Sequence, residues 1–317
     1  MSSKLEILKM IEAGKISVEQ GLELIEALEQ TERIEGDIRD ESEVYEKETD
    51  RIEQSIMMSF DVALTTCKIN IERSNVDDVT IELFDDKTRE LVAKPEWLHF
   101  YEEKHYISIK ETRVTNLTDI FDFFKSGSGS MSPIFINVKV PMEFDVDRGK
   151  FSTVSGNISM IGLRAIDLEA KSVSGKIVAT DLKAKVIQLK STSGNVIADN
   201  VKAARIYLNS TSGKVKSSGI YNKVESKTIS GNIEIDGGEN LDEITLSSVS
   251  GKISVYVPEP EMYNLFFDSV SGSMDTSGFA VVDKNIAGKK HIAIDNRSDH
   301  KTIKINTVSG KILLDKK

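Results

Sequence analysis

The 317-residue sequence lacks the features that mark secreted or membrane-spanning proteins. Its single cysteine, Cys67, excludes an internal disulfide framework. No stretch is long and apolar enough for a transmembrane helix, and the first residues are amphipathic rather than charged and then apolar, so no signal peptide is predicted. Aromatic residues (6%) and prolines (five) are few, whereas glycine and serine are frequent, which favours a repetitive β-structure. We therefore expect a cytoplasmic protein with peripheral membrane contact at most.

Charge is distributed unevenly along the chain. Residues 151–317 contain 22 Lys or Arg and 18 Asp or Glu, a balance of +4, and the whole chain carries −10, so residues 1–150 carry −14. The acidic half argues against nucleic-acid binding. The basic residues of the other half are too dilute in the sequence to predict a phosphate-binding surface.

One six-residue motif occurs eight times: Ser/Thr-x-Ser-Gly, then Asn, Lys or Ser, then an apolar residue. Its glycines are separated by 19, 19, 19, 18, 20, 21 and 38 residues, and we interpret the last spacing as two periods with one turn lost. A period this short and regular predicts a solenoid. The turn glycines are Gly156, Gly175, Gly194, Gly213, Gly231, Gly251, Gly272 and Gly310.

Apolar residues alternate on both sides of each glycine, as Ile187 and Leu189 do before Gly194 and Val196 and Ala198 do after it. This pattern predicts two strands joined by a tight turn, in which glycine supplies a positive φ. The fold class is therefore mainly β, a narrow β-helix-like solenoid of about ten coils with roughly 19 residues each.

Three columns of side chains are predicted beside the turn. Inward hydroxyls such as Ser172 and Ser174 are expected to bond one another along the axis. The residue after the glycine alternates between Asn and Lys, which separates the lysines and lets Asn hydrogen-bond along an exposed edge; a basic groove for an anionic polymer is the alternative. The residue two before the glycine points outward, as a contact ridge or under loops: Val154, Val173, Thr192, Thr211, Ile229, Val249, Val270 and Val308.

The sequence predicts no enzyme, cofactor or metal site. His99 and His105 are six residues apart rather than four, Cys67 lies in a strand pattern, and no hydrolase, phosphate-loop or dinucleotide motif occurs. A polysaccharide-active β-helix enzyme is the alternative, but the aspartates that could form its cleft occupy different positions in the repeat. These are Asp167, Asp181, Asp199, Asp236 and Asp275.

Residues 1–30 predict a helical hairpin, with Gly14 as a C-terminal cap and Ser17 starting the second helix. Its apolar stripes cannot bury much alone, so we expect them to contact a partner, a second copy or the β-part of the same chain. The candidate contact residues are Leu8, Ile11, Leu22 and Ile25. The strongly charged residues 31–55 are interpreted as a solvated linker.

Residues 56–150 alternate between apolar and polar residues, as strands do, but lack the glycine motif. We interpret them as irregular coils that cap the regular solenoid of residues 151–317. An insertion at residues 117–132 joins an aromatic cluster to a Gly/Ser tether. It is predicted either to cover the open end of the solenoid or to dock on a membrane or partner. The residues concerned are Phe121, Phe123 and Phe124.

The hairpin resembles the SHOCT-like helical module of Gram-positive bacterial proteins, and the Ser-Gly-Asn/Lys-Ile repeats resemble the β-strand-repeat family labelled "putative adhesin". Together they resemble the YvlB and LiaX group. The resemblance implies a role in the response to cell-envelope stress, near the membrane, alongside membrane-embedded partner proteins and two-component signalling. Together with the repeat pattern, this predicts a non-enzymatic scaffold. A surface-displayed, adhesin-like binding protein is the alternative.

Overall fold

The computed structural model describes residues 56–111, 134–238, 240–258, 263–276, 283–286, 289–294 and 301–316. Every regular element within them is a β-strand, which confirms the mainly-β prediction. The unit Ile56–Lys317 is compact, and the 22 strands in its described residues form one sheet. The predicted hairpin (1–30), linker (31–55) and insertion (117–132) lie outside the described residues.

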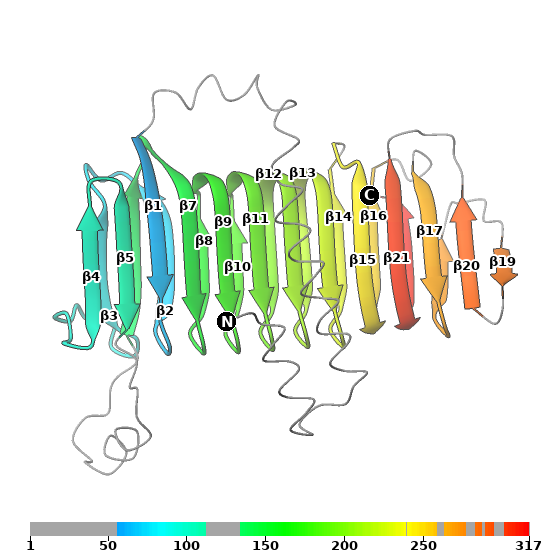
Figure 1. The fold of residues 1–317 in the computed structure, drawn as a ribbon, viewed down its shortest axis with the longest axis horizontal. Coiled ribbons are helices and arrows are strands. Elements are labelled where there is room, and N and C mark those ends of the chain that lie inside the picture. The colour runs from blue at the N-terminus through cyan, green and yellow to red at the C-terminus, as the bar shows by residue number, and fades with distance from the viewer. Residues whose placement is uncertain are drawn as a thin grey trace, which may run out of the picture. The chain divides into compact units, whose positions relative to one another are not determined.

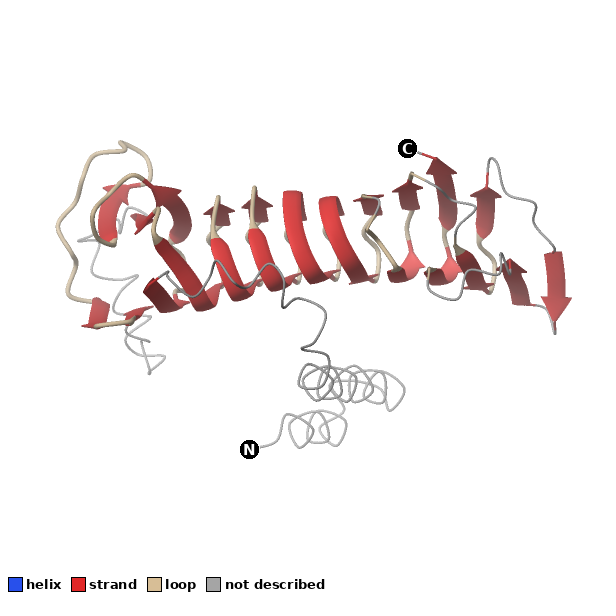
Figure 2. Ribbon diagram, turned by 90° about the horizontal axis from the view of Figure 1, so that it is seen from above, coloured by secondary structure: helices blue, strands red, loops and turns tan. Residues whose placement is uncertain are grey.

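The sheet folds over into two layers of parallel strands, stacked as successive rungs (Figures 1 and 2). What we call the first layer consists of the strands that lead into a glycine turn and of two further strands that extend their row at one end. In spatial order these are β5 (Tyr106–Glu111), β1 (Ile56–Ala63), β7 (Phe144–Thr153), β9 (Arg164–Ser172), β11 (Lys183–Ser191), the second halves of β12 (Val196–Ser210) and β13 (Val215–Thr228), β15 (Glu243–Ser250), β21 (Thr302–Ser309) and β17 (Asn264–Ser269).

The second layer consists of the strands that leave a glycine turn and of two further strands at the same end. They follow the same spatial order, so that each pairs with its counterpart on the next rung. They are β6 (Ile134–Pro141), β2 (Lys68–Ser74), β8 (Ile158–Ile161), β10 (Ile177–Thr180), the first halves of β12 and β13, β14 (Ile233–Gly237), β16 (Ile253–Val257), β22 (Lys311–Lys316) and β18 (Ser273–Thr276). Within the described residues this gives ten rungs, the number predicted.

The core lies between the two layers and follows the predicted alternation. In β11, Ile187 and Leu189 are buried, and in the strand that follows, Val196 and Ala198 are completely buried. The strands predicted in residues 56–150 are present as well, as β2, β3 (Thr80–Asp85), β5 and β6. The hydrophobic interior is therefore continuous from the irregular part into the regular repeat.

The eight glycines form a line along one border of the sheet, which we call the glycine edge. A methyl group on Gly175 would lie 1.7 Å from the carbonyl oxygen of Gly156, and one on Gly194 would lie 2.0 Å from that of Gly175. The same approach repeats at every later glycine of the line, with 2.7 Å as the largest value. Among the eight, only Gly251 has a positive φ (151°). The predicted reason for glycine was therefore wrong at the other seven turns: rungs stack too closely for any side chain.

The hydroxyl groups beside the turn also differ from the prediction. Only the residue three before the glycine is buried, and it bonds to backbone rather than to another hydroxyl. Ser191 Oγ accepts the Gly194 N–H (2.9 Å) and donates to the Gly175 carbonyl of the preceding rung (3.2 Å). Ser210 makes the same two bonds at 3.0 Å each. The second hydroxyl of the pair is exposed at most turns, as Ser174 and Ser193 are, and half-buried at Ser250. The buried hydroxyls of Ser172, Ser191 and Ser210 thus join their own turns to the rung before, whereas those of Ser248 and Thr307 form no hydrogen bond with any described residue.

The opposite border has its own periodic corner, which the sequence analysis missed. Gly162, Asp181 and Asn200 lie 19 residues apart and have φ values of 67°, 54° and 51°. Gly, Asn and Asp tolerate this left-handed conformation better than other residues. The next corner, 19 residues later, is Gly219 with φ 150°. The 19-residue spacing of small or Asx residues was the available signal.

Both ends of the stack have an order that the sequence did not predict. The first rung of the chain, β1–β2, lies between β5–β6 and β7–β8. The last rung, β21–β22, lies between β15–β16 and β17–β18, so the interpretation of the 38-residue spacing as a lost turn was wrong. Antiparallel strands cover the outer rungs: β4 (Leu98–Glu103) and β3 at one end, β20 (Lys289–Ile294) and β19 (Asp283–Ile286) at the other.

A buried charge cluster fastens the inserted rung β1–β2 to the regular array. Asp145 is 4% exposed and accepts from Arg164 Nε (2.7 Å) and Arg73 Nη2 (3.3 Å). Arg73, two residues after Ile71 on β2, has an almost buried side chain, and this burial lowers the pKa of its guanidinium. Three rungs are therefore held together by one carboxylate.

Gly194→Ala is expected to lower the free energy of unfolding by about 2–3 kcal/mol, because the new methyl group overlaps the carbonyl of the preceding rung. Urea titration followed by circular dichroism measures it. Ser193→Ala, on the exposed side of the same turn, is the control and should change stability by no more than about 0.5 kcal/mol. Equal unfolding midpoints for the two variants would contradict the close-approach explanation.

Asp145→Ala is expected to lower the free energy of unfolding by about 3–5 kcal/mol, because it leaves the Arg73 guanidinium buried without its anion. The exposed neighbour Asp147→Ala is the matched control. Adding Arg73→Met to Asp145→Ala should restore part of the loss, since the buried cation is then gone. No restoration would mean that Asp145 acts through packing instead.

Candidate interaction surface

A ridge of β-branched side chains follows the glycine edge on its outer side. Val173, Ile229 and Val249 are 47%, 53% and 46% exposed, and Val154, Val270 and Val308 are exposed to a similar extent. Thr192 is exposed and Thr211 is half-buried. The outward orientation predicted for these eight residues is therefore confirmed. With a rung spacing of about 4.8 Å, the ridge extends about 34 Å.

A shallow groove accompanies the far end of this ridge. It has a volume of about 240 Å³ and lies across three neighbouring rungs, those of β15, β21 and β17. Its walls are the ridge residues Val249, Val308 and Val270 together with polar residues of the strand ends. Those polar residues are Ser247, Ser248, Asp268, Ser269, Asn306 and Thr307. The groove thus joins residues that lie far apart in the chain, because β21 lies between β15 and β17.

The residue after each glycine forms the predicted Asn/Lys row. Asn157 Oδ1 accepts the backbone N–H of Lys176 on the next rung at 2.9 Å. The Asn195–Lys214 and Asn232–Lys252 pairs do the same at 2.9 Å each, so the expected hydrogen bonds along the edge are confirmed. The alternation ends at the inserted rung, which places Lys311 beside Lys252.

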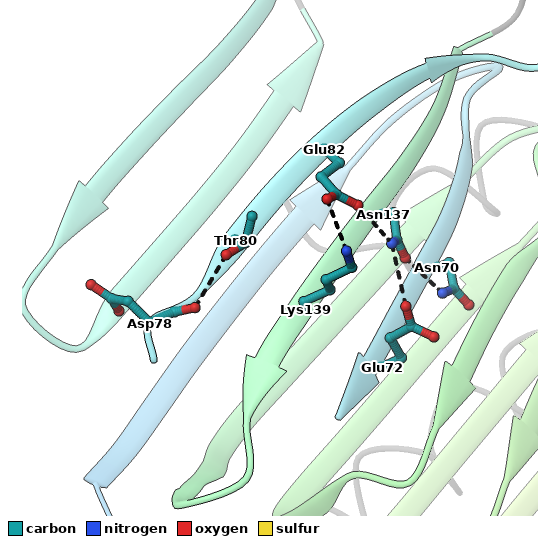
Figure 3. Close-up of polar contacts among 7 residues, drawn as sticks. All are labelled: Asn70, Glu72, Asp78, Thr80, Glu82, Asn137 and Lys139. Atoms are coloured by element: carbon teal, nitrogen blue, oxygen red, sulfur yellow. Dashed lines mark hydrogen bonds and ion pairs between the residues drawn. The ribbon is translucent and has the colours of Figure 1, made fainter. Parts of the chain in front are cut away.

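A polar network covers the outer surface of the second layer near its first rungs (Figure 3). The Asn70 amide donates to Asn137 Oδ1 (2.7 Å), and the Asn137 amide donates to Glu82 (3.2 Å) and Glu72 (3.3 Å). Lys139 donates to the other oxygen of Glu82 (2.8 Å) and lowers the pKa of that carboxyl, so Glu82 remains ionised. Because these groups satisfy one another, we assign the network to fastening β3 onto the stack rather than to binding.

The described residues contain no group of three or more His, Cys, Asp and Glu side chains that could hold a metal ion. His99 lies on β4 and His105 in the turn that follows it. Cys67 occupies the glycine position of its rung, since its carbonyl faces Gly156, and it is 1% exposed. Burial, which has the largest effect, and the nearby Glu111 raise the pKa of its thiol to about 12.

The aspartates considered for a cleft are partly aligned, contrary to the prediction. Ser218 Oγ donates to Asp199 (2.6 Å), and Ser218 pairs in register with Asp236, so one column of the second layer contains both carboxylates two rungs apart. Asp167 lies on the first layer, Asp181 at the corner, and Asp275 pairs with Leu313 in a different column. The five do not converge on one site.

The predicted contact residues of the hairpin (Leu8, Ile11, Leu22 and Ile25) and of the insertion (Phe121, Phe123 and Phe124) all lie outside the described residues. In the part of the chain that is described, no helix has the length and apolar character needed to cross a membrane.

Comparison with known proteins gives two family matches. A family model described as Toastrack DUF4097 matches residues 57–315, and one described as a SHOCT-like domain matches residues 3–33. No curated protein gives a significant match.

Several solved structures are similar at low identity. A "putative cell adhesion protein" from Clostridium sporogenes is 13% identical (TM-score 0.29), with 84% of this chain and 95% of that chain covered. "Putative adhesins" from Parabacteroides distasonis (TM-score 0.44; 83% and 92% covered) and Bacteroides fragilis (TM-score 0.39; 83% and 94% covered) are each 10% identical. Each TM-score is too low to establish a common fold by itself.

Cys67 is expected to resist thiol reagents in the folded protein. With a pKa near 12, about one thiol in ten thousand is ionised at pH 8, and burial also blocks access. Reaction with Ellman's reagent should be undetectable over an hour at pH 8 and complete within minutes in concentrated urea. Rapid modification of the native protein would contradict a structural role.

Proposed function

The chain belongs to the Toastrack DUF4097 family, and from that premise we propose that it is a non-catalytic binding protein whose ridge contacts a protein partner. The observation that carries the proposal is the row of exposed β-branched residues along the glycine edge. Six of its eight residues are Val or Ile, and exposed apolar side chains gathered in one row mark an interaction site more often than scattered ones do.

The rigidity of the edge makes it suitable for this role. Ridge residues such as Val173 and Ile229 stand on turns that are held by buried hydroxyls, so little conformational entropy is lost when they are covered. The groove beside Val249 and Val270 offers room for one large side chain of the partner. We therefore infer a partner segment with an apolar strip and one anchoring side chain at the β15–β21–β17 end.

The setting proposed for this activity is the bacterial cell-envelope stress response, near the membrane and with membrane-embedded partner proteins. Its support is the resemblance to the YvlB and LiaX group together with the SHOCT-like match over residues 3–33. Residues 1–30 would recruit a partner or a second copy.

An adhesin-like protein displayed on the cell surface is the second candidate, supported by the resemblance of the repeats to a family labelled as adhesins. The two settings differ in where the protein is found. Fractionation of cells, combined with protease treatment of intact cells, separates them: degradation from outside supports display, and protection supports action inside the envelope.

The ridge is tested by photocrosslinking with a benzoyl-phenylalanine at Ile229 in cells under envelope stress. We expect one discrete adduct, identified by mass spectrometry and reproduced with the purified partner. Val173→Asp together with Val249→Asp should reduce that adduct at least tenfold, because charges interrupt the apolar row.

The matched control is Ile161, an exposed apolar residue on the second layer (38% exposed). A crosslinker there should give no adduct, and Ile161→Asp should leave the Ile229 adduct unchanged. An equal loss with Ile161→Asp, or no adduct from Ile229, would contradict the ridge as the contact surface.

A further inference from the structure

The outer surface of the first layer concentrates positive charge that is dilute in the sequence. Strands β9 and β11 and the second halves of β12 and β13 lie side by side (Figure 1). They carry nine basic residues and three acidic ones. The basic residues are Arg164, Lys171, Lys183, Lys185, Lys190, Lys202, Arg205, Lys223 and Lys227, and the acidic ones are Asp167, Glu169 and Glu225. We call this surface the basic face.

The register places like charges directly opposite one another on neighbouring rungs. Lys183 pairs with Arg164 on one side and with Lys202 on the other. A second column pairs Lys171 with Lys190. Like charges opposite one another on adjacent strands destabilise a sheet. The folded chain therefore retains a repulsion that a bound anion would relieve.

Neighbouring carboxylates neutralise only the borders of the basic face. Arg164 binds Asp145, Lys171 binds Glu169, and Lys223 binds Glu243. At the centre, Lys183, Lys185, Lys190 and Lys202 are exposed, and within the described part of the chain none of them forms an ion pair. Strand β11 carries three of these lysines and no acidic residue.

Neutral hydrogen-bonding side chains lie between the cations. Gln188 pairs in register with Tyr207, and Lys190 pairs with Asn209. Tyr207 is half-buried, and this burial raises the pKa of its phenol, so the hydroxyl stays neutral beside the lysines. The ring of Tyr207, between Gln188 on one rung and Glu225 on the next, offers a sugar unit a stacking surface and hydrogen bonds, and the lysines of the neighbouring columns offer counter-charges.

We propose that the basic face binds a linear acidic glycopolymer, a chain of sugar units with carboxylate or phosphate groups, laid across the strands along the stack. Cations in one column recur about every 4.8 Å, so regularly spaced anions meet a cation on successive or alternate rungs. This site is separate from the ridge, and neither depends on the other.

Two other anionic partners fit the basic face less well. Proteins that bind single-stranded nucleic acid without sequence preference stack successive bases on several aromatic rings, whereas these four strands present one, Tyr207. A lipid surface is contacted by a continuous apolar strip. The exposed large hydrophobic residues here, Ile166 and Ile220, are three rungs apart.

The test measures the anisotropy of fluorescently labelled polygalacturonate dodecamers at 50 mM salt. The variant combines Lys183→Gln, Lys190→Gln and Lys202→Gln. Its control combines Lys176→Gln, Lys252→Gln and Lys311→Gln, which removes the same charge from the Asn/Lys row. We expect the wild type and the control to bind equally and the variant to bind at least tenfold more weakly. Methyl-esterified dodecamers, which are neutral, should not bind.

Three further readouts distinguish a binding role from a structural one. The slope of log Kd against the logarithm of the salt concentration should be smaller by about two in the variant. This is expected when three contacts between a lysine and an anion are lost. Its melting temperature should rise by about 1–3 °C, because repulsion between rungs is removed. Bound dodecamer should also protect Lys183, Lys190 and Lys202 of the wild type from acetylation while leaving Lys176 reactive.

Several results would overturn the proposal. One is no binding of the dodecamer by the wild type, and another is an equal loss in the control. Tighter binding of oligo(dT) or of vesicles with 30% phosphatidylglycerol than of polygalacturonate would assign the basic face to nucleic acid or lipid instead. The acetylation experiment uses the unaltered protein, so it can still refute the proposal if the triple variant fails to fold.

Discussion

The structure depends on how closely the backbone of one rung approaches the next at the glycine edge. The carbonyl of Gly175 occupies the space where a side chain on Gly194 would be, and Ser191 bonds both turns at once. Because that contact repeats in register, the strands before and after it must also stack in register. The flat parallel layers, the continuous core and the straight ridge all follow from it.

A stack of parallel rungs has two open ends, and the chain closes each by the same device. The first and last rungs of the chain lie one position inside the stack. Antiparallel strands cover the outer rungs, β3 and β4 at one end and β19 and β20 at the other. The inserted rungs gain partners on both sides, and Asp145 secures one of them with buried charge. Such ends leave less unpaired backbone for unwanted pairing.

Because the rungs stack in register, a residue type that recurs once per repeat forms a row on the surface. One valine per repeat becomes a ridge, an asparagine on alternate rungs becomes a row of hydrogen bonds, and lysines on adjacent strands become the basic face. Each surface is extended, and each lies on a rigid support. This is what a binding protein requires, and it needs no catalytic residue.

The sequence by itself determined the repeating unit: its strands, its turns, the line of glycines and the outward direction of residues such as Val173. These features follow from period-two alternation and from a 19-residue repeat, and both patterns concern residues that are close in the chain or one repeat apart. Only the tertiary structure decided which rungs meet at the ends, since the contact of Gly310 with Gly251 joins residues far apart in the chain. It also decided that Ser191 bonds backbone, that Cys67 stands in a glycine position, and that Lys183 lies beside Lys202 on a concentrated basic face. Spacing along a chain predicts contacts only where chain order and spatial order coincide.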